Sequence, residues 1–150
     1  MSADRAIVER WVERVLQSYP AQTLPFLRGE QDPFRNPVGH TLRESLTILA
    51  GELMGKMDRQ RIAQALDAII RMRAVQDFGP SDAVRFVFDL RTAIREWGGA
   101  VPDSLESRID ELALLAFDHY MGCREQIFAL RINELRLKAR YAASEEGETP

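Results

Sequence analysis

The chain has 150 residues, of which 45% are hydrophobic and 29% are charged, and its formal net charge is −3. This length and hydrophobic content predict one soluble domain with a packed core and exclude a wholly disordered chain. The acidic net charge argues against a dedicated nucleic-acid-binding protein, because such proteins meet the phosphate backbone with basic surfaces. A single cysteine, Cys123, excludes an internal disulfide and any metal site that needs several cysteines.

The N-terminal residues lead directly into a charged amphipathic segment, so we expect no signal peptide. The longest apolar runs, such as 112–117, are far shorter than the roughly 20 residues that a membrane-spanning helix needs. We therefore expect a cytoplasmic protein that does not insert into membranes. Its basic residues are 18 arginines and 2 lysines. Arginine is suited to bidentate pairing with carboxylates, so this bias predicts ion pairs that brace one helix against another.

Apolar residues recur with helical spacing in the first segment, which Pro20 ends. These residues are Ile7, Val8, Trp11, Val12, Val15 and Leu16. Four prolines and two glycines follow within residues 20–40, which predicts a turn-rich ordered loop with room for a short helix over 21–27.

Two further helices are predicted between residues 41 and 78. Thr41 and Glu44 have the spacing of a capping box, which predicts a helix that begins there and ends near Gly55. Asp58 is the predicted N-cap of the next helix, which Gly79 ends.

The remaining chain predicts two more helices. Ser81 is the predicted N-cap of a helix that runs to Trp97 and buries more than one face. From Asp103 to about residue 143 there is no proline, and only Gly122 interrupts the pattern. Forty helical residues measure about 60 Å, whereas a globule of this size is roughly 40 Å across, so the last helix either breaks near Gly122 or projects.

These patterns together predict the fold class. We expect an all-α chain with five to six helices that form a single domain over residues 1–143. The polar acidic tail, residues 144–150, is predicted to be disordered.

A distinctive motif lies between the third and fourth long helices. Residues 73–78 read Arg-Ala-Val-Gln-Asp-Phe, and Pro-Ser, Ala-Val and Phe-Val pairs follow by residue 87. A second group precedes it in the same order, namely Trp11, Tyr19-Pro20, Phe26-Leu27, Asp32-Pro33-Phe34 and Asn36-Pro37-Val38-Gly39.

These motifs resemble the N-terminal domain family of the RsbRD-type RsbT co-antagonist proteins, over roughly residues 11–95. The sequence departs from the family pattern at Asp82, where glutamine is expected, and at Arg91, where lysine is usual. The resemblance implies a globin-like helical sensor without haem that acts through protein contacts. Stressosome relatives join this domain to a STAS output domain, and none follows in these 150 residues, so the resemblance implies a free-standing regulatory protein. It also leaves open an accessory subunit of an anaerobic sulfur-respiration redox complex.

A small-ligand site is predicted where the motif meets the proline-rich loop. An anionic metabolite would bind near the arginines and the start of the Ser81 helix. The candidate residues are Asn36, Arg71, Arg73, Gln76, Asp77 and Ser81. The alternative is a buried structural corner in which Arg73 pairs with Asp77 and Gln76 bonds loop carbonyls around Asn36.

The last helix predicts a weak coiled-coil seam that would form a homodimer or bind a partner helix, and the alternative is an ordinary core helix. Its candidate residues are Ile109, Leu112, Ala116, His119, Cys123 and Leu130. His119 also allows a haem ligand, against which a surface or dimer-seam histidine is the simpler interpretation. Cys123 allows a redox-sensing thiol, against which a buried core position is simpler.

No catalytic arrangement is evident. The sequence has no glycine-rich phosphate loop, nucleophile elbow or His-Glu metal pair. We therefore expect a protein that is not an enzyme and that needs no metal or cofactor. A small-molecule-binding protein stays the alternative to a regulatory module.

Overall fold

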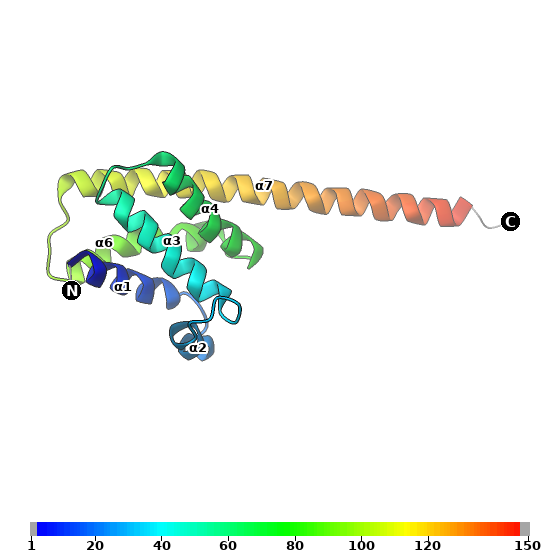
Figure 1. Ribbon diagram of the computed structural model, residues 1–150. Coiled ribbons are helices and arrows are strands. Elements are labelled where there is room, and N and C mark those ends of the chain that lie inside the picture. Colours follow the sequence, from blue (N-terminus) through cyan, green and yellow to red (C-terminus); the bar gives the residue numbers. More distant parts are fainter. Residues whose placement is uncertain (1–2, 148–150) are drawn as a thin grey trace.

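The computed structural model describes residues 3–147, and this part of the chain is helical without strands (Figure 1). This confirms the all-α prediction, although the helices are more numerous than expected. They are α1 (Ala3–Leu16), the short 3-10 helix η1 (Ala21–Thr23), α2 (Leu24–Gly29), α3 (Pro37–Leu53), α4 (Arg59–Val75), α5 (Pro80–Val84), α6 (Phe86–Glu96) and α7 (Asp103–Gly147).

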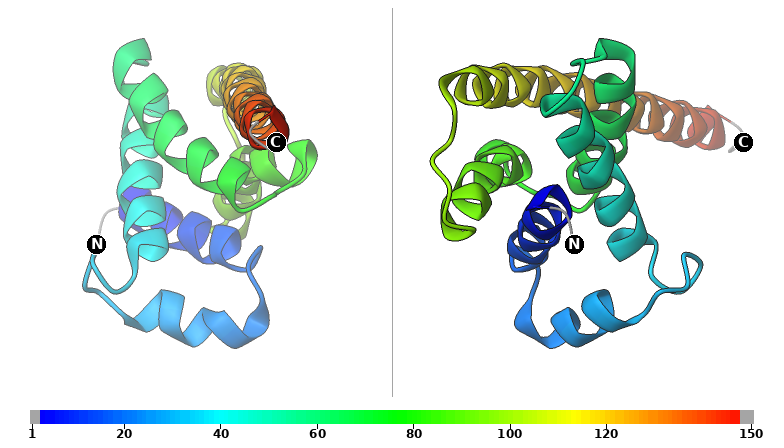
Figure 2. Two further views of the ribbon diagram at one scale, coloured as in Figure 1. Left: turned by 90° about the vertical axis from the view of Figure 1, so that its right-hand side faces the viewer. Right: turned by 60° about the vertical axis from the view of Figure 1, so that its left-hand side comes forward.

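The helices α1 to α6 and the first half of α7 form a packed body, from which the second half of α7 projects (Figures 1 and 2). Helix α3 packs on α4, α1 on α6, and α7 on both α4 and α6. The predicted apolar stripe of α1 is buried, and Trp11 is fully covered. The Trp11 indole Nε1 donates to the carbonyl of Phe86 at 2.6 Å, so this core residue also ties α1 to the start of α6.

Arginines brace the helices as predicted from the arginine bias. Arg14 on α1 contacts Glu96 at the end of α6, with 2.6 Å between Nη2 and Oε1. Arg91 on α6 bonds Asp110 on α7 at 3.0 Å. These pairs are partly exposed, so each contributes little stability, and each links two helices that already pack on each other.

Two predicted helix starts were wrong for the same physical reason. Helix α3 begins at Pro37 rather than Thr41, with Asn36 as N-cap, and α5 begins at Pro80 with Gly79 as N-cap rather than Ser81. Proline is favoured at the first position of a helix and forces the residue before it out of the helical region. Each helix therefore starts at its proline and not at the next polar residue.

The other helix boundaries lie closer to their predicted positions. Asp58 caps α4 as predicted, because its carboxylate accepts from the backbone N–H groups of Gln60 and Arg61. The single helix expected over 81–97 is divided at Arg85, whose backbone keeps helical angles. Phe86 is buried with the rest of the α6 core face, while Phe88 is 43% exposed, so α6 buries one broad face rather than several.

Helix α7 continues through Gly122 without a break, so of the two outcomes expected for this helix the structure shows projection. Its 45 residues correspond to about 68 Å. The helix reaches Gly147, four residues past its predicted end, and the remaining tail residues 148–150 lie outside the described part of the chain.

Candidate functional site

The motif over residues 73–78 forms a corner between α4 and α5. Helix α4 ends at Val75, and Asp77 then adopts a left-handed backbone conformation with φ of 61°. The Phe78 N–H returns to the carbonyl of Arg73 at 3.1 Å. The Tyr120 hydroxyl of α7 donates to the Phe78 carbonyl at 2.8 Å. The corner is therefore fixed to the long helix as well as to the helices that it joins.

Arg73 lies at the centre of this corner and is only 1% exposed. Its Nη1 donates to the Asp82 carbonyl and its Nη2 to the Ser18 hydroxyl, both at 3.0 Å. The guanidinium carbon lies 4.7 Å from the ring centre of Phe78. The ring centres of Tyr19 and Phe86 lie farther from it, each at 5.7 Å. Aromatic faces favour a desolvated cation, so the corner offsets part of the cost of burying this charge.

The predicted ion pair between Arg73 and Asp77 was wrong. Residues four apart meet only inside a continuous helix, and the left-handed turn at Asp77 carries its carboxylate away from Arg73. Asp77 is exposed and instead approaches Arg124 on α7, with 3.8 Å between the charged atoms. Burial lowers the pKa of Arg73, against the opposing effects of Tyr19, Asp89 and Asp82.

A cavity of about 340 Å³ adjoins Arg73. It is lined by Ser18, Arg73, Phe78, Asp82, Arg85, Phe86 and Asp89. Burial raises the pKa of Asp89, while Arg14, Arg73 and Arg85 act in the opposite direction. The cavity thus holds two arginines and two aspartates, and the aspartates balance the cations that an anionic ligand would need.

The other predicted ligand-site residues do not gather around Arg73. Asn36 is 1% exposed, and its amide donates to the carbonyls of Leu27 and Glu30 while its oxygen caps α3 at Gly39. Gln76 accepts from the Tyr19 hydroxyl at 3.0 Å, so the predicted bonds from Gln76 to carbonyls near Asn36 were wrong.

Ser81 and Arg71 also face away from the buried corner. Ser81 is exposed in the first turn of α5. Arg71 bonds Asp67 at 3.0 Å and Gln126 on α7 at 3.3 Å, so it braces the point from which α7 leaves the body. Binding of a small ligand by these six residues stays a prediction, and the geometry supplies no single cavity for it.

Arg71 instead shares a shallow cavity of about 260 Å³ with His119 and Cys123. This volume is below the roughly 300–1,000 Å³ of drug-sized ligand sites, so the geometry gives the haem alternative no support. Cys123 is 5% exposed, and burial raises the pKa of its thiol against the opposing effect of Arg71. Reactive cysteines have the opposite character, namely exposure and a lowered pKa. In the described residues 3–147, no group of three or more His, Cys, Asp or Glu residues is placed to hold a metal ion.

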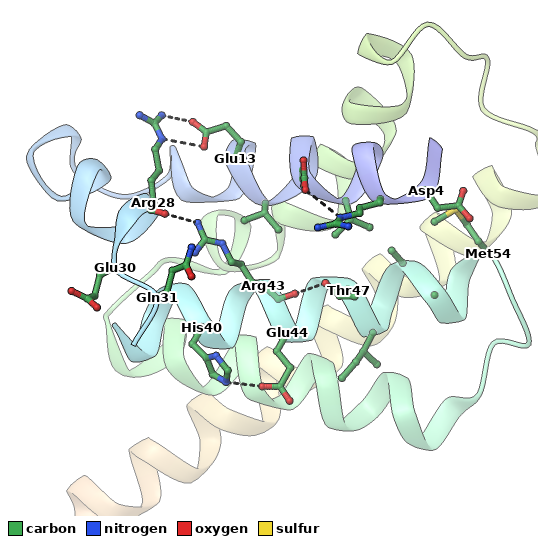
Figure 3. A pocket seen from close by; sticks show the side chains of 17 residues that line it. Asp4, Glu13, Arg28, Glu30, Gln31, His40, Arg43, Glu44, Thr47 and Met54 are labelled. Atoms are coloured by element: carbon green, nitrogen blue, oxygen red, sulfur yellow. Dashed lines mark hydrogen bonds and ion pairs between the residues drawn. The ribbon is translucent and has the colours of Figure 1, made fainter. Parts of the chain in front are cut away.

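A third cavity, larger than the two above, was missed by sequence reasoning. It has a volume of about 1290 Å³ and lies between α1, α2 and α3 (Figure 3). Its apolar wall includes Val8 and Val12 of α1, Ile48 of α3, and Met54 at the C-cap of α3. Gly51 also lines it, and a Cβ built there would meet nothing within 4 Å. Gly51 lies on the exposed side of α3, away from the buried residues of this helix, so helical periodicity gave no signal for the cavity.

Polar side chains cross the rim of this groove and are bonded to one another (Figure 3). Arg28 binds Glu13 through two guanidinium nitrogens, one of them at 3.0 Å. Arg43 donates to the Arg28 carbonyl at 3.1 Å, and His40 approaches Glu44 at 2.9 Å. The groove therefore combines an apolar wall with a rim of neutralised charges.

The predicted coiled-coil seam is divided between the body and the projecting arm. Ile109, Leu112 and Ala116 are fully buried and Cys123 nearly so, which means that this chain's own core covers four of the six predicted seam residues. These four side chains pack in the chain's own core, as the alternative of an ordinary core helix expects, and a seam at the other two residues stays a prediction. His119 is half-buried, and Leu130 is 64% exposed.

No helix among residues 3–147 has the length and hydropathy to cross a bilayer. A relative from Archaeoglobus fulgidus, described as an uncharacterized protein, is 30% identical over 138 residues, which are 87% of this chain and 83% of the relative. No solved structure matches the chain.

The sequence profile described as the RsbT co-antagonist protein rsbRD N-terminal domain matches residues 5–135. This range contains both motif groups and extends beyond the predicted range of 11–95. It also includes the packed half of α7 and the first part of the projecting half. The chain therefore belongs to the family of RsbRD N-terminal domains.

Proposed function

We propose that this protein is a non-enzymatic sensory or regulatory module that acts through protein–protein contact at the projecting half of α7. The observation that carries the proposal is the contrast within that helix. Its first half is a core element of the body, and its second half, beginning near Gln126, exposes Leu130, Leu137 and Tyr141 by 53–71%. Exposed apolar side chains that line up on one helix mark an interaction surface.

These exposed residues continue the spacing of the buried ones. With Ile127 they are spaced by three, seven and four residues, with Glu134 between Leu130 and Leu137, and they extend the core face of α7 past the end of the body. We call Ile127, Leu130, Leu137 and Tyr141 the core-side stripe. Ile127 still packs against the core, whereas the other three lie beyond it. A partner helix seated on this stripe would continue the packing that the body begins.

Contacts at the base of the arm support transmission of a signal from the body. Arg71 on α4 reaches Gln126, and the Tyr120 hydroxyl bonds the Phe78 carbonyl of the corner. A change in the position of α4 or of the corner would therefore shift the start of the arm. Family membership supports the same role, while the globin-like arrangement, the cytoplasmic location and the identity of the partner stay predictions.

The test is capture of partners from the native host followed by mass spectrometry, with paired variants. Leu130→Glu and Leu137→Glu together should abolish capture of any specific partner, because they add charge to the core-side stripe. Ala129→Glu adds one glutamate on an exposed face between the apolar stripes and should leave capture unchanged, whereas Leu130→Glu alone should already weaken it. Equal capture by all variants would contradict the proposal.

A second candidate function is binding of a small amphipathic molecule, which the groove of about 1290 Å³ between α1, α2 and α3 favours. Gly51→Leu would place a leucine side chain in the groove, whereas Gly29→Leu adds the same side chain at an equally open position outside the residues that line the groove. A ligand of this site should be lost from Gly51→Leu and retained by Gly29→Leu in native mass spectrometry. Equal retention of the ligand by both variants would exclude the groove as its binding site.

A further inference from the structure

A second apolar stripe runs along the opposite face of α7, over both the packed and the projecting half. It consists of Leu114, Phe117, Met121, Phe128 and Leu135, which are 41–70% exposed, together with half-buried Ile132. We call these six residues the outer stripe. Leu114, Met121, Phe128 and Leu135 are spaced by seven residues, the repeat of a helix that packs along another helix.

The outer stripe faces away from the body. At 100° per residue, its members lie on average about 130° around the helix from the buried residues Ile109, Leu112, Ala116 and Tyr120. The body therefore does not obstruct a second helix that approaches this face. The chain also folds its own core without covering these side chains, so the stripe has no partner within the described residues.

Charge changes sign along the same helix. Residues 103–125 carry six acidic side chains and two arginines, whereas residues 126–143 carry four basic side chains and one glutamate. A parallel pair of α7 helices would place like charges side by side. An antiparallel pair would place the acidic half of each helix against the basic half of the other, which is the arrangement that electrostatics favours.

We infer that the outer stripe binds a second copy of this chain, with the two α7 helices antiparallel. A two-fold axis between Arg124 and Glu125 sets Leu114 level with the partner's Leu135. The same axis sets Met121 level with the partner's Phe128, and Phe117 level with the partner's Ile132. The arm of each copy then lies along the exposed face of the other copy's packed half.

This inference rests on the proposed function, because it assigns the partner of one face of the same arm. It leaves the core-side stripe, with Leu130 and Leu137, free for a regulatory partner. The two surfaces lie on different faces of α7, so variants of one surface do not remove the other. Failure of the antiparallel dimer and failure of partner capture are therefore separate results.

The test is disulfide cross-linking of the full chain in a Cys123→Ala background. Leu114→Cys and Leu135→Cys introduce thiols at positions that are 70% and 65% exposed, so neither should disturb the core. A 1:1 mixture of the two proteins should form a disulfide-linked dimer under mild oxidation, and each protein alone should stay largely uncross-linked. Leu114→Cys mixed with Leu130→Cys is the matched control and should not cross-link, because Leu130 lies on the core-side stripe.

Cross-linking of Leu114→Cys or Leu135→Cys with itself at least as well as in the mixture would show a parallel pair and overturn the inference. A strict monomer in light scattering at high protein concentration, with no cross-link in any mixture, would also overturn it. Raising the salt concentration should weaken the dimer, since the opposed charges are exposed. Met121→Glu should raise the dimer dissociation constant at least tenfold without changing the helical content.

Discussion

The two halves of α7 have the same helical conformation and a similar apolar spacing, but they have opposite environments. In the first half, Ile109, Leu112 and Ala116 are completely buried against α4 and α6. In the second half, Leu130, Leu137 and Tyr141, which continue the same stripe, are mostly exposed. Periodicity alone therefore establishes that a helix has an apolar face, and only the rest of the fold decides whether that face stabilises the chain or is left to bind another molecule.

The largest expected effect is a difference between matched leucines on the two halves. Leu112→Ala should lower the free energy of unfolding by about 2–5 kcal/mol, because it removes a fully buried side chain and leaves a cavity. Leu130→Ala removes the same atoms from a side chain that is 64% exposed and should change stability by less than about 0.5 kcal/mol. Urea denaturation measures both changes. Equal effects would contradict the conclusion that the first half of α7 belongs to the core and the second half does not.

Substitution of Arg73 tests the packed body, which is the stabilising part of the molecule. Arg73→Ala should lower the free energy of unfolding by about 2–4 kcal/mol, because it empties a buried position and removes the donors to Ser18 and the Asp82 carbonyl. Arg71→Ala is the matched control, since Arg71 is more than half exposed and solvent screens its ion pair with Asp67, so its removal should change stability far less. A loss below about 0.5 kcal/mol at Arg73 would show that the corner does not depend on its guanidinium.

Removal of the projecting half of α7 tests whether this half contributes to the stability of the body. A chain that ends at residue 129 keeps every residue that is described as buried, so at concentrations where both proteins are monomeric its unfolding free energy should fall by less than about 1 kcal/mol. Thermal unfolding followed by circular dichroism measures this. A chain that fails to fold would show that the arm supports the body and is not a separate binding element.

The smallest expected effect concerns the half-buried Asp89 beside Arg73. Burial raises the pKa of Asp89 above its value in the unfolded chain, so the folded protein binds this proton more tightly. The unfolding free energy should therefore decrease as the pH rises through the pKa of Asp89 in the folded protein. Lowering the pH again, so that Asp89 is protonated, should restore this component of the stability. Asp89→Asn should stabilise the protein slightly at pH 7 and remove this component from the pH profile. A destabilised Asp89→Asn protein at pH 7 would show that attraction to the arginines outweighs burial.

Much of the fold was predictable from local spacing. The stripe of Trp11 and Val15, the Asp58 cap and the uninterrupted last helix all follow from helical periodicity and capping chemistry. The starts of α3 and α5 were misplaced because Thr41 and Ser81 have the chemistry of N-caps, whereas the proline upstream of each sets the cap at the residue before that proline, Asn36 and Gly79.

The candidate sites were harder to predict because they depend on contacts between distant segments. The pair of Arg73 and Asp77 failed since the helix ends between them, and the true partners Ser18 and Asp82 lie on other elements. The groove depends on how α1, α2 and α3 cross, which no local pattern encodes. The heptad of α7 was visible, but the sequence did not indicate which face the body would cover.

Helix α7 is one rigid helix whose second half projects from the body. Spin labels at Leu114→Cys and Leu137→Cys in the Cys123→Ala background, diluted with unlabelled protein, test this by pulsed electron paramagnetic resonance. Twenty-three helical steps predict a backbone separation of about 35 Å and a narrow distance distribution. A broad distribution, or a main distance below about 25 Å, would mean that the helix breaks near Gly122 or folds back on the body, and would contradict the account.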